Sequence, residues 1–271
     1  MLIVNLNNVN FRLGNLILII LRVISCNILY YKQKTISIVD IKNRNNIVLK
    51  NFPDYFYFDE YEKDDNNIIS DFFNDQFYNM LSNDQKEDIL NTYIKPYIDY
   101  DISDIYDSIN INFDCDLIIH IRSGDIFDKT DDFNKNIDSD TFRWFMQPPY
   151  SFYENIINEN NYKNIFILSE TDNNPIIQKL MNNYKNIYFN KNDINTDFKI
   201  LLNCKNLVSS TSDFVLSAVY LSNVKNIIYS SRNYYFYYIQ YKFNIKYYDY
   251  NNYYNLPINS YEEKIEIMLN N

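Results

Sequence analysis

The sequence predicts an α/β protein whose C-terminal half contains a doubly wound parallel sheet. Two observations support this. Strand-like and helix-like segments alternate after residue 115, and four Lys-Asn pairs recur there at spacings of 22, 20 and 20 residues. Parallel strands need a crossover helix between them, so this alternation is typical of such a sheet. The pairs are Lys163-Asn164, Lys185-Asn186, Lys205-Asn206 and Lys225-Asn226.

Each Lys-Asn pair precedes an apolar run, which predicts the end of a helix followed by a strand. A cation in the last turn suits the helix dipole, and Asn tolerates the left-handed conformation that often follows a helix. The expected strands are 117–121, 165–168, 187–189, 207–208 and 227–229. The expected helices are 151–161, 174–184, 197–204 and 213–222.

The first half is also predicted to mix strands and helices. The expected order is a strand at 2–6, a loop at 7–15, a helix at 16–30, and strands at 35–40 and 47–50. Ser82 and Gln85 have the spacing of a capping box, which predicts a helix that runs toward Pro96. We expect an N-terminal α/β domain over 1–115 and a Rossmann-like domain over 116–271.

Composition excludes several classes of function. The net charge of −10 and the pI near 4.6 argue against a nucleic-acid partner or an anionic membrane surface. The apolar stretch Leu16–Ile24 contains Arg22 and is too short for a transmembrane segment, so we expect a buried helix. Cys26, Cys115 and Cys204 are far apart, which predicts reduced and mostly buried thiols in a reducing, cytoplasmic compartment.

The chain has only two glycines, and both mark backbone positions of interest. Gly14 lies in Arg12-Leu13-Gly14-Asn15, at the expected first turn from strand to helix. Gly124 lies in His120-Ile121-Arg122-Ser123-Gly124-Asp125, directly after the strand expected at 117–121. Ligands bind an open parallel sheet at the carboxyl ends of its strands, so this second run is a candidate site.

Polar residues follow the other expected strands as well. Ser169-Glu170-Thr171-Asp172 follows one strand, and Ser209-Ser210-Thr211-Ser212 leads from another into a helix. Hydroxyl residues at a helix N-terminus offer donors to a phosphate, and Arg122 can add a bidentate contact. With Asp172 as an acceptor for a ribose or base, these residues would hold a nucleotide diphosphate without a metal.

The run from His120 to Asp125 resembles the H-x-R-x-G-D motif of the fucosyltransferase superfamily, which includes the α1,2-, α1,6- and protein O-fucosyltransferases. Three more segments resemble parts of this superfamily, in the same order, and together they cover nearly the whole chain. They are Phe11–Asn15 (a G-L-G-N turn), Thr171-Asp172-Asn173 (T-D-D or S-D-D), and Asp197–Lys205 with Ser209–Phe214 (D-F-x-L-M-x-x-C-K and N-S-T-F-S-W-W).

The resemblance implies a GT-B arrangement of two Rossmann-like domains and an inverting, metal-independent glycosyltransferase. Its substrates would be a nucleotide-sugar donor, GDP-fucose above all, and a glycan or protein hydroxyl, with no cofactor. Arg122 would neutralise the β-phosphate, with His120 close by and Asp125 holding the guanidinium. The residues implied to bind the donor are Asp172 at the guanosine, Ser210, Thr211 and Ser212 at the phosphates, and Gly14 and Asn15 across the cleft.

Departures from the pattern keep other functions open. Ser123 stands where the superfamily usually has a second arginine, and Val215-Leu216 replace a tryptophan pair. A different nucleotide-sugar donor or a binding protein without catalysis therefore remain alternatives. A metal-dependent GT-A enzyme is a third, since Asp114-Cys115-Asp116 and Asp138-Ser139-Asp140 are D-x-D patterns, although the first precedes its strand.

Each candidate also has a purely structural interpretation. His120 could be a hydrogen-bonded core residue, Arg122 could pair with Asp125 only to fix a loop, and Asp172 could be the N-cap of the helix at Pro175. The serine run could likewise be only a cap. A carboxylate just after the arginine motif is the natural place for a catalytic base, and the candidates are Asp128, Asp131 and Asp132. The tyrosine-rich segment 233–250 is expected to be a buried strand rather than a sugar platform.

Overall fold

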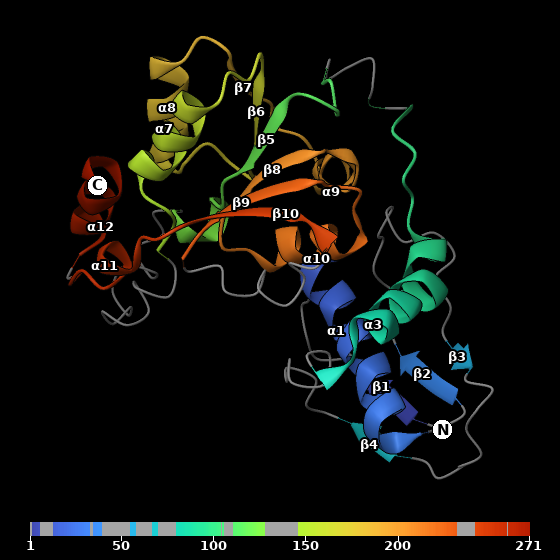
Figure 1. Cartoon of the computed structure of the whole chain (residues 1–271). Helices are drawn as coiled ribbons and strands as arrows, with labels where there is room; N and C mark the ends of the chain where they lie inside the picture. Colours follow the sequence, from blue (N-terminus) through green and yellow to red (C-terminus); the bar gives the residue numbers. More distant parts are fainter. Residues whose placement is uncertain are drawn as a thin grey trace. The chain divides into compact units, whose positions relative to one another are not determined.

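The structure is a computed structural model that divides into two compact units. One unit holds Met1–Asp101 together with Leu216–Leu221, and the other holds Ile102–Val215 and Ser222–Asn271. The residues that the structure describes are 2–5, 13–32, 35–39, 55–57, 67–69, 80–103, 105, 111–127, 146–231, 242–258 and 260–271. Figure 1 shows both units with their strand and helix labels.

The N-terminal unit contains a four-stranded mixed sheet with the order β3-β2-β1-β4. Strand β1 pairs in parallel with β2 and β4, whereas β2 and β3 are antiparallel. The strands are β1 (Leu2–Asn5), β2 (Thr35–Val39), β3 (Tyr55–Tyr57) and β4 (Asn67–Ile69). The strands expected at 2–6 and 35–40 are confirmed, and the one at 47–50 falls outside the described residues.

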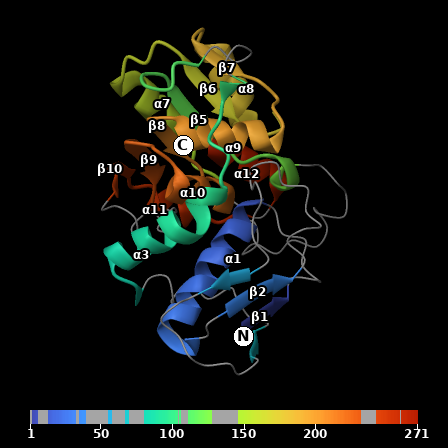
Figure 2. The same cartoon turned by 90° about the vertical axis from the view of Figure 1, so that its right-hand side faces the viewer.

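Helix α1 (Leu13–Cys26) lies along β1 and β2, as Figures 1 and 2 both show. It continues as a π-helical turn, η1 (Asn27–Tyr31). Nearly all its described side chains are buried, as the apolar sequence predicts. Its start corrects one expectation: Gly14 and Asn15 belong to the first turn of the helix and not to a loop.

Helix α3 (Asn83–Ile89) begins with the predicted capping box. Gln85 N donates to Ser82 Oγ over 3.2 Å, and Ser82 N donates to Gln85 Oε1 over 3.0 Å. The chain continues through a π-helical turn, η3 (Leu90–Ile94), and a 3-10 turn, η4 (Lys95–Tyr97), so the helical segment ends next to Pro96 as expected. Across the described parts of the chain, no helix is both long and apolar enough to cross a membrane.

The C-terminal unit contains the predicted parallel sheet, with six strands in the order β10-β9-β8-β5-β6-β7. Every pairing in it is parallel. Counted along the chain, this order is that of the doubly wound nucleotide-binding fold, in which the first and fourth strands lie side by side. The strands are β5 (Leu117–His120), β6 (Ile165–Leu168), β7 (Ile187–Phe189), β8 (Asn206–Ser209), β9 (Asn226–Ser230) and β10 (Asn244–Tyr248).

Helices cover both faces of this sheet (Figure 1). The crossover helices are α7 (Tyr150–Glu159), α8 (Pro175–Asn183), α9 (Ile194–Asn203) and α10 (Asp213–Leu221). Two further helices follow β10, namely α11 (Asn251–Tyr254) and α12 (Tyr261–Asn270). All four predicted helices of this half are confirmed within three residues at each end.

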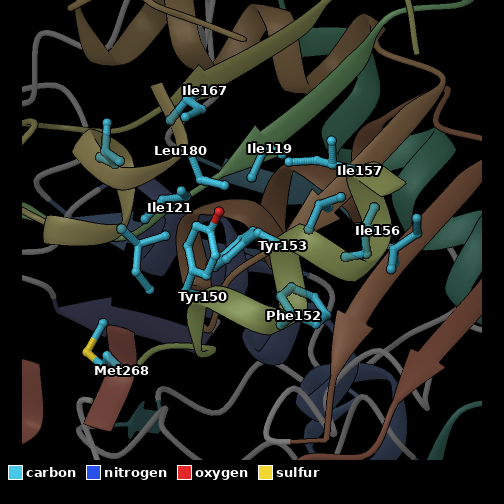
Figure 3. Close-up of a cluster of buried hydrophobic side chains, with 14 of the residues drawn as sticks. Ile119, Ile121, Tyr150, Phe152, Tyr153, Ile156, Ile157, Ile167, Leu180 and Met268 are labelled. Carbon is cyan, nitrogen blue, oxygen red and sulfur yellow. The ribbon is translucent and has the colours of Figure 1, made fainter. Parts of the chain in front are cut away.

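Alternate residues of β5 serve the two faces. Ile119 and Ile121 join the main hydrophobic cluster with α7, α8 and α12, and Figure 3 shows them facing Tyr153 and Leu180. His120 points to the opposite face, where its ring lies 5.9 Å from that of Phe214 in the first turn of α10. The strands are therefore buried on both faces, which accounts for their nearly continuous apolar sequences.

Strand β10 corrects the expectation for the tyrosine-rich segment. It lies at the edge of the sheet, and Tyr247 in it is 48% exposed. Lys246 on the same strand forms an ion pair with Glu159 of α7. Residues 232–241 fall outside the described part, so the expected buried strand is wrong only for 244–248.

The Lys-Asn pairs lead into strands as predicted, but for a different physical reason. Among the described residues, only Lys32 and Gly124 have a positive φ, so the asparagines of these pairs do not adopt the left-handed conformation. The side chains of Asn206 and Asn226 instead link neighbouring strands at the amino edge of the sheet, together with Asn244, which starts β10 but belongs to no Lys-Asn pair. Asn244 Nδ2 donates to Asn226 Oδ1 over 3.1 Å, and Asn226 Nδ2 donates to Asn206 Oδ1 over 2.7 Å.

We call these three residues the asparagine ladder, and it continues to the first strand through Asp116. Asn206 Nδ2 lies 3.4 Å from the Asp116 carbonyl oxygen, and Asn164 Nδ2 donates to Asp116 Oδ1 over 3.2 Å. An amide side chain both donates and accepts, so one residue type can bridge successive strands in register. Asparagine thus recurs where strands start because its side chain hydrogen-bonds to the residue at the start of the neighbouring strand.

The ladder predicts a graded loss of stability. Replacing Asn226 with Ala removes one donor and one acceptor from the middle of the ladder, which should lower the free energy of unfolding by about 1–3 kcal/mol. Replacing Asn244 with Ala removes a single donor at the exposed end and should cost less than half of that. Urea unfolding of the two variants measures the difference, and equal losses would contradict a cooperative ladder.

Candidate functional site

The candidate site lies at the carboxyl edge of β5 and β8, the two strands between which the order of the sheet reverses. The chain leaves β5 for α7 on one face and leaves β8 for α10 on the other. Connections that diverge in this way open a crevice at the strand ends, where doubly wound sheets bind ligands. A backbone bond from Ser210 N to His120 O, 3.1 Å long, holds the two strand ends together.

His120 is the last residue of β5, and it is buried beside the serine run. Its Nδ1 atom lies 2.7 Å from Ser210 Oγ. Burial, reinforced by the positive charge of Arg122, lowers the pKa of His120 to about 3. The imidazole is therefore neutral at pH 7, and it acts as a hydrogen-bond partner that fixes the Ser210 hydroxyl.

Arg122 projects from the loop that follows β5 and is half-buried. Its backbone is held by Asn174, whose Nδ2 donates to Arg122 O over 3.0 Å. Asn174 also caps α8 by accepting from Ile176 N, and it is fully buried. The backbone of Arg122 is thus held by the connection from β6 to α8.

Asn174 corrects the structural interpretation of Asp172, because it and not Asp172 is the N-cap before Pro175. Sequence reasoning missed this residue, although an Asn directly before a Pro is a recognisable start of a helix. Asp172 is exposed at the carboxyl end of β6, and its Oδ2 accepts from Gln178 Nε2 over 3.0 Å.

Ser123 has a structural role in the same loop. Its hydroxyl is buried, lies 2.8 Å from Thr171 Oγ1, and accepts from Asn174 N over 3.0 Å. These contacts join the loop after β5 to the loop after β6. A long charged side chain would not fit this buried position without breaking both bonds, so the serine matches its local surroundings.

Gly124 meets one firm constraint on its backbone and one that a movement of the exposed Glu170 side chain would relieve. Its φ is +52°, a conformation that L-residues rarely adopt, and a Cβ atom there would lie 2.1 Å from Glu170 Oε2. Its N–H donates to Thr171 Oγ1 over 3.2 Å. The glycine that the sequence singled out therefore permits a tight turn, η5 (Gly124–Ile126), directly after Arg122. Asp125 contributes backbone to this turn.

The serine run connects β8 to α10. Ser212 Oγ accepts from Phe214 N over 3.3 Å, which satisfies a free donor at the helix start, as a cap would. Ser210 bonds to His120, as described above. Thr211 Oγ1 is different, because it is enclosed and has no hydrogen-bond partner among the residues that the structure describes. An unpaired buried hydroxyl is costly, so it marks a position where a ligand atom would be favourable.

The structure thus brings His120, Arg122 and Ser210–Ser212 to one edge of one sheet, with Asp172 after the adjacent strand. Gly14 and Asn15 lie in the N-terminal unit, and their share in a common site stays a prediction. Asp114 and Asp116 lie before β5, at the opposite edge, where Asp116 Oδ2 accepts from Asn112 N. Asp128, Asp131, Asp132 and the D-x-D pattern at 138–140 fall outside the described residues.

Metal ligands are not grouped in the described part of the chain, where no three His, Cys, Asp or Glu side chains come together. The cysteines there are free thiols, with Cys26 and Cys204 buried and Cys115 exposed. Burial raises the pKa of Cys26 to about 11 and that of Cys204 to about 12, so both stay protonated at neutral pH.

Comparisons of the chain with protein-family models, curated proteins and solved structures find no significant match.

The Gly124 turn can be tested by a double-mutant cycle. Gly124→Ala should lower the free energy of unfolding by about 1–2 kcal/mol because of the positive φ, plus a further loss from the contact with Glu170. Glu170→Ala should recover only the second part, since it makes room without changing φ. Urea unfolding of both single variants and the double variant separates the terms, and full recovery in the double variant would show that φ is unimportant.

Proposed function

We propose that the C-terminal unit binds a nucleotide diphosphate at the carboxyl edge of β5 and β8. The observation that carries the proposal is that Arg122 and the Ser210–Ser212 turn follow the carboxyl ends of two paired strands, β5 and β8, at the point where the strand order reverses. The arginine offers a bidentate charged contact, and the turn offers hydroxyls and helix N-terminal amides. Because the whole chain has a charge of −10, a cation held here is a local and selective feature.

We further propose that the chain is an inverting glycosyltransferase with a GT-B arrangement, similar to fucosyltransferases and using GDP-fucose. Inversion requires that the acceptor hydroxyl attacks the anomeric carbon as the bond to the diphosphate breaks, and that its proton passes to a base, for which the sequence offers Asp128, Asp131 and Asp132. Arg122 would stabilise the negative charge that grows on the leaving diphosphate, a form of electrostatic catalysis that needs no metal. The resemblance of the run from His120 to Asp125 to the H-x-R-x-G-D motif supports this assignment.

In this mechanism, His120 is a positioning residue. With a pKa near 3 it does not hold a proton to give at neutral pH. Its contact with Ser210 instead orients a hydroxyl toward the crevice. Asp172 remains exposed at the end of the next strand and, together with Gln178, would meet the nucleoside.

Two alternatives lead to different outcomes. A binding protein without catalysis is favoured by the buried, hydrogen-bonded Ser123, which supplies no second charge to the site. A metal-dependent enzyme receives less support, because Asp114 and Asp116 lie at the amino edge of the sheet. Donor hydrolysis or sugar transfer distinguishes an enzyme from a binding protein, and loss of binding in EDTA identifies the metal-dependent class.

The first test is Arg122→Ala, with Lys185→Ala as the matched control. Each removes one positive charge, but the exposed Lys185 precedes β7 at the opposite edge of the sheet. Arg122→Ala should weaken GDP binding by about 1.5–3 kcal/mol, or roughly 10- to 100-fold in Kd, and the control should not. Isothermal titration with GDP, UDP and dTDP measures this, and unchanged binding in a folded Arg122→Ala variant would remove the central residue from the proposal.

Thr211→Val gives a second test, in which stability and binding change in opposite directions. Valine fills the same volume without the unpaired hydroxyl, so the ligand-free variant should be more stable by about 1 kcal/mol. The same variant should bind the nucleotide more weakly, because it lacks a donor to the phosphate. Thermal unfolding without ligand and titration with GDP report the two effects. A loss of stability would indicate that the hydroxyl serves the fold.

A further inference from the structure

A second cation lies beneath the arginine loop and has no role in the proposed mechanism. Lys264 of α12 is only 2% exposed, although lysine is rarely buried without a partner. Its Nζ atom lies 4.6 Å from the centre of the Phe127 ring. Phe127 directly follows η5 and is itself buried, so the lysine reaches the underside of the loop that begins with Arg122.

Helix α12 is fixed against this loop by a separate contact. Tyr261 Oη donates to Phe127 O over 3.4 Å, and the Tyr261 and Phe127 rings meet edge to face. Ser260 caps the helix by accepting from Glu263 N. The position of Lys264 is therefore set by the packing of α12 and not by a charged partner.

Within the part of the chain that the structure describes, no hydrogen bond or ion pair to Lys264 Nζ is found. Burial, and after it the positive charge of the nearby Arg122, lower the pKa of Lys264 to about 8. Two like charges close together in a buried setting are unfavourable, and an aromatic ring offsets only part of the cost. An acidic chain has many carboxylates, yet none pairs with this lysine among the described residues.

Lys179 shows how a neighbouring lysine in the same layer is satisfied. Its Nζ lies 4.0 Å from the centre of the Tyr150 ring and also donates to Leu269 O over 2.7 Å. Both lysines thus lie over an aromatic ring, but within the described residues a hydrogen-bond acceptor is found only for Lys179. The contrast indicates that Lys264 is prepared for an anion that comes from outside the chain.

We propose that Lys264 is the second positive contact of the diphosphate site, approaching from the α12 face of the sheet while Arg122 approaches from its carboxyl edge. The proposal rests on the proposed function, in that the anion is the diphosphate of the nucleotide. Pyrophosphate and nucleoside diphosphates share the group that the lysine recognises. In this arrangement Lys264, under the turn, would bind the phosphates from one side, and the serine run would bind them from the other.

The test compares Lys264→Met with Lys179→Met, since methionine keeps the length of the side chain without its charge. In the ligand-free protein, Lys264→Met should keep or raise the thermal midpoint, whereas Lys179→Met should lower it. In titrations, Lys264→Met should weaken the binding of pyrophosphate and of GDP at least tenfold, and Lys179→Met should bind both as the wild type does. Guanosine, which lacks phosphates, should bind the wild type and Lys264→Met equally.

Unchanged binding of pyrophosphate and GDP by Lys264→Met would overturn the inference, even if Arg122→Ala confirms the nucleotide site. A lower thermal midpoint of Lys264→Met would also overturn it, because the ammonium group would then serve the fold. If the wild type binds pyrophosphate but no nucleotide, and Lys264→Met loses that binding, the anion contact stands while the proposed function fails. If the wild type binds neither ligand, both fail.

Discussion

The parallel pairing of β5 with β8 is the constraint on which the rest of the C-terminal unit depends. Among the six strands of this sheet, β5 comes first and β8 fourth along the chain, yet they are neighbours in the sheet. The crossovers that follow them therefore leave toward opposite faces. The loop with Arg122 and the serine run consequently both start at this end of the β5–β8 pair, and helix α12 packs on Phe127 at the end of that loop. The bond from Ser210 to His120 extends the pairing past the last strand residues and joins the two strand ends.

A second constraint is the scarcity of glycine, because of which the loops at this edge are held by side-chain hydrogen bonds. Gly124 allows the turn that follows Ser123, and hydroxyl and amide side chains hydrogen-bond the rest of the loop. Ser123, Thr171 and Asn174 join two crossovers into a single hydrogen-bonded unit. The backbone of Arg122 is part of this unit, and a backbone fixed in this way is what a binding site would require of the residue that carries its charge.

Much of the C-terminal sheet was predictable because β6, β7, β8 and β9 are short apolar runs that begin at or just after a Lys-Asn pair, and β5 is an apolar run of the same kind. The parallel pairing and the carboxyl-edge location of His120 and Arg122 followed from the same alternation of strands and helices, whereas the order of the strands is known only from the structure. Other features were not predictable, since they depend on contacts between segments far apart in the chain. The cap at Asn174, the exposure of β10 and the burial of Lys264 against Phe127 each arise from packing that local propensity does not encode. The left-handed asparagines were wrong because hydrogen bonds between strands outweighed the local conformational preference.

The asparagine ladder fixes where the strands start, and the number of residues in each strand then determines where it ends at the opposite edge of the sheet. Strands β5 and β8 each run four residues from that indexed start, so His120 and Ser209 arrive at the same height. One residue inserted into either strand would advance its end by about 3.3 Å and turn every later side chain to the other face. A change in length in a crossover would instead leave the pairing of His120 with Ser209 intact, so the relative position of the two strand ends depends on the number of residues in each strand.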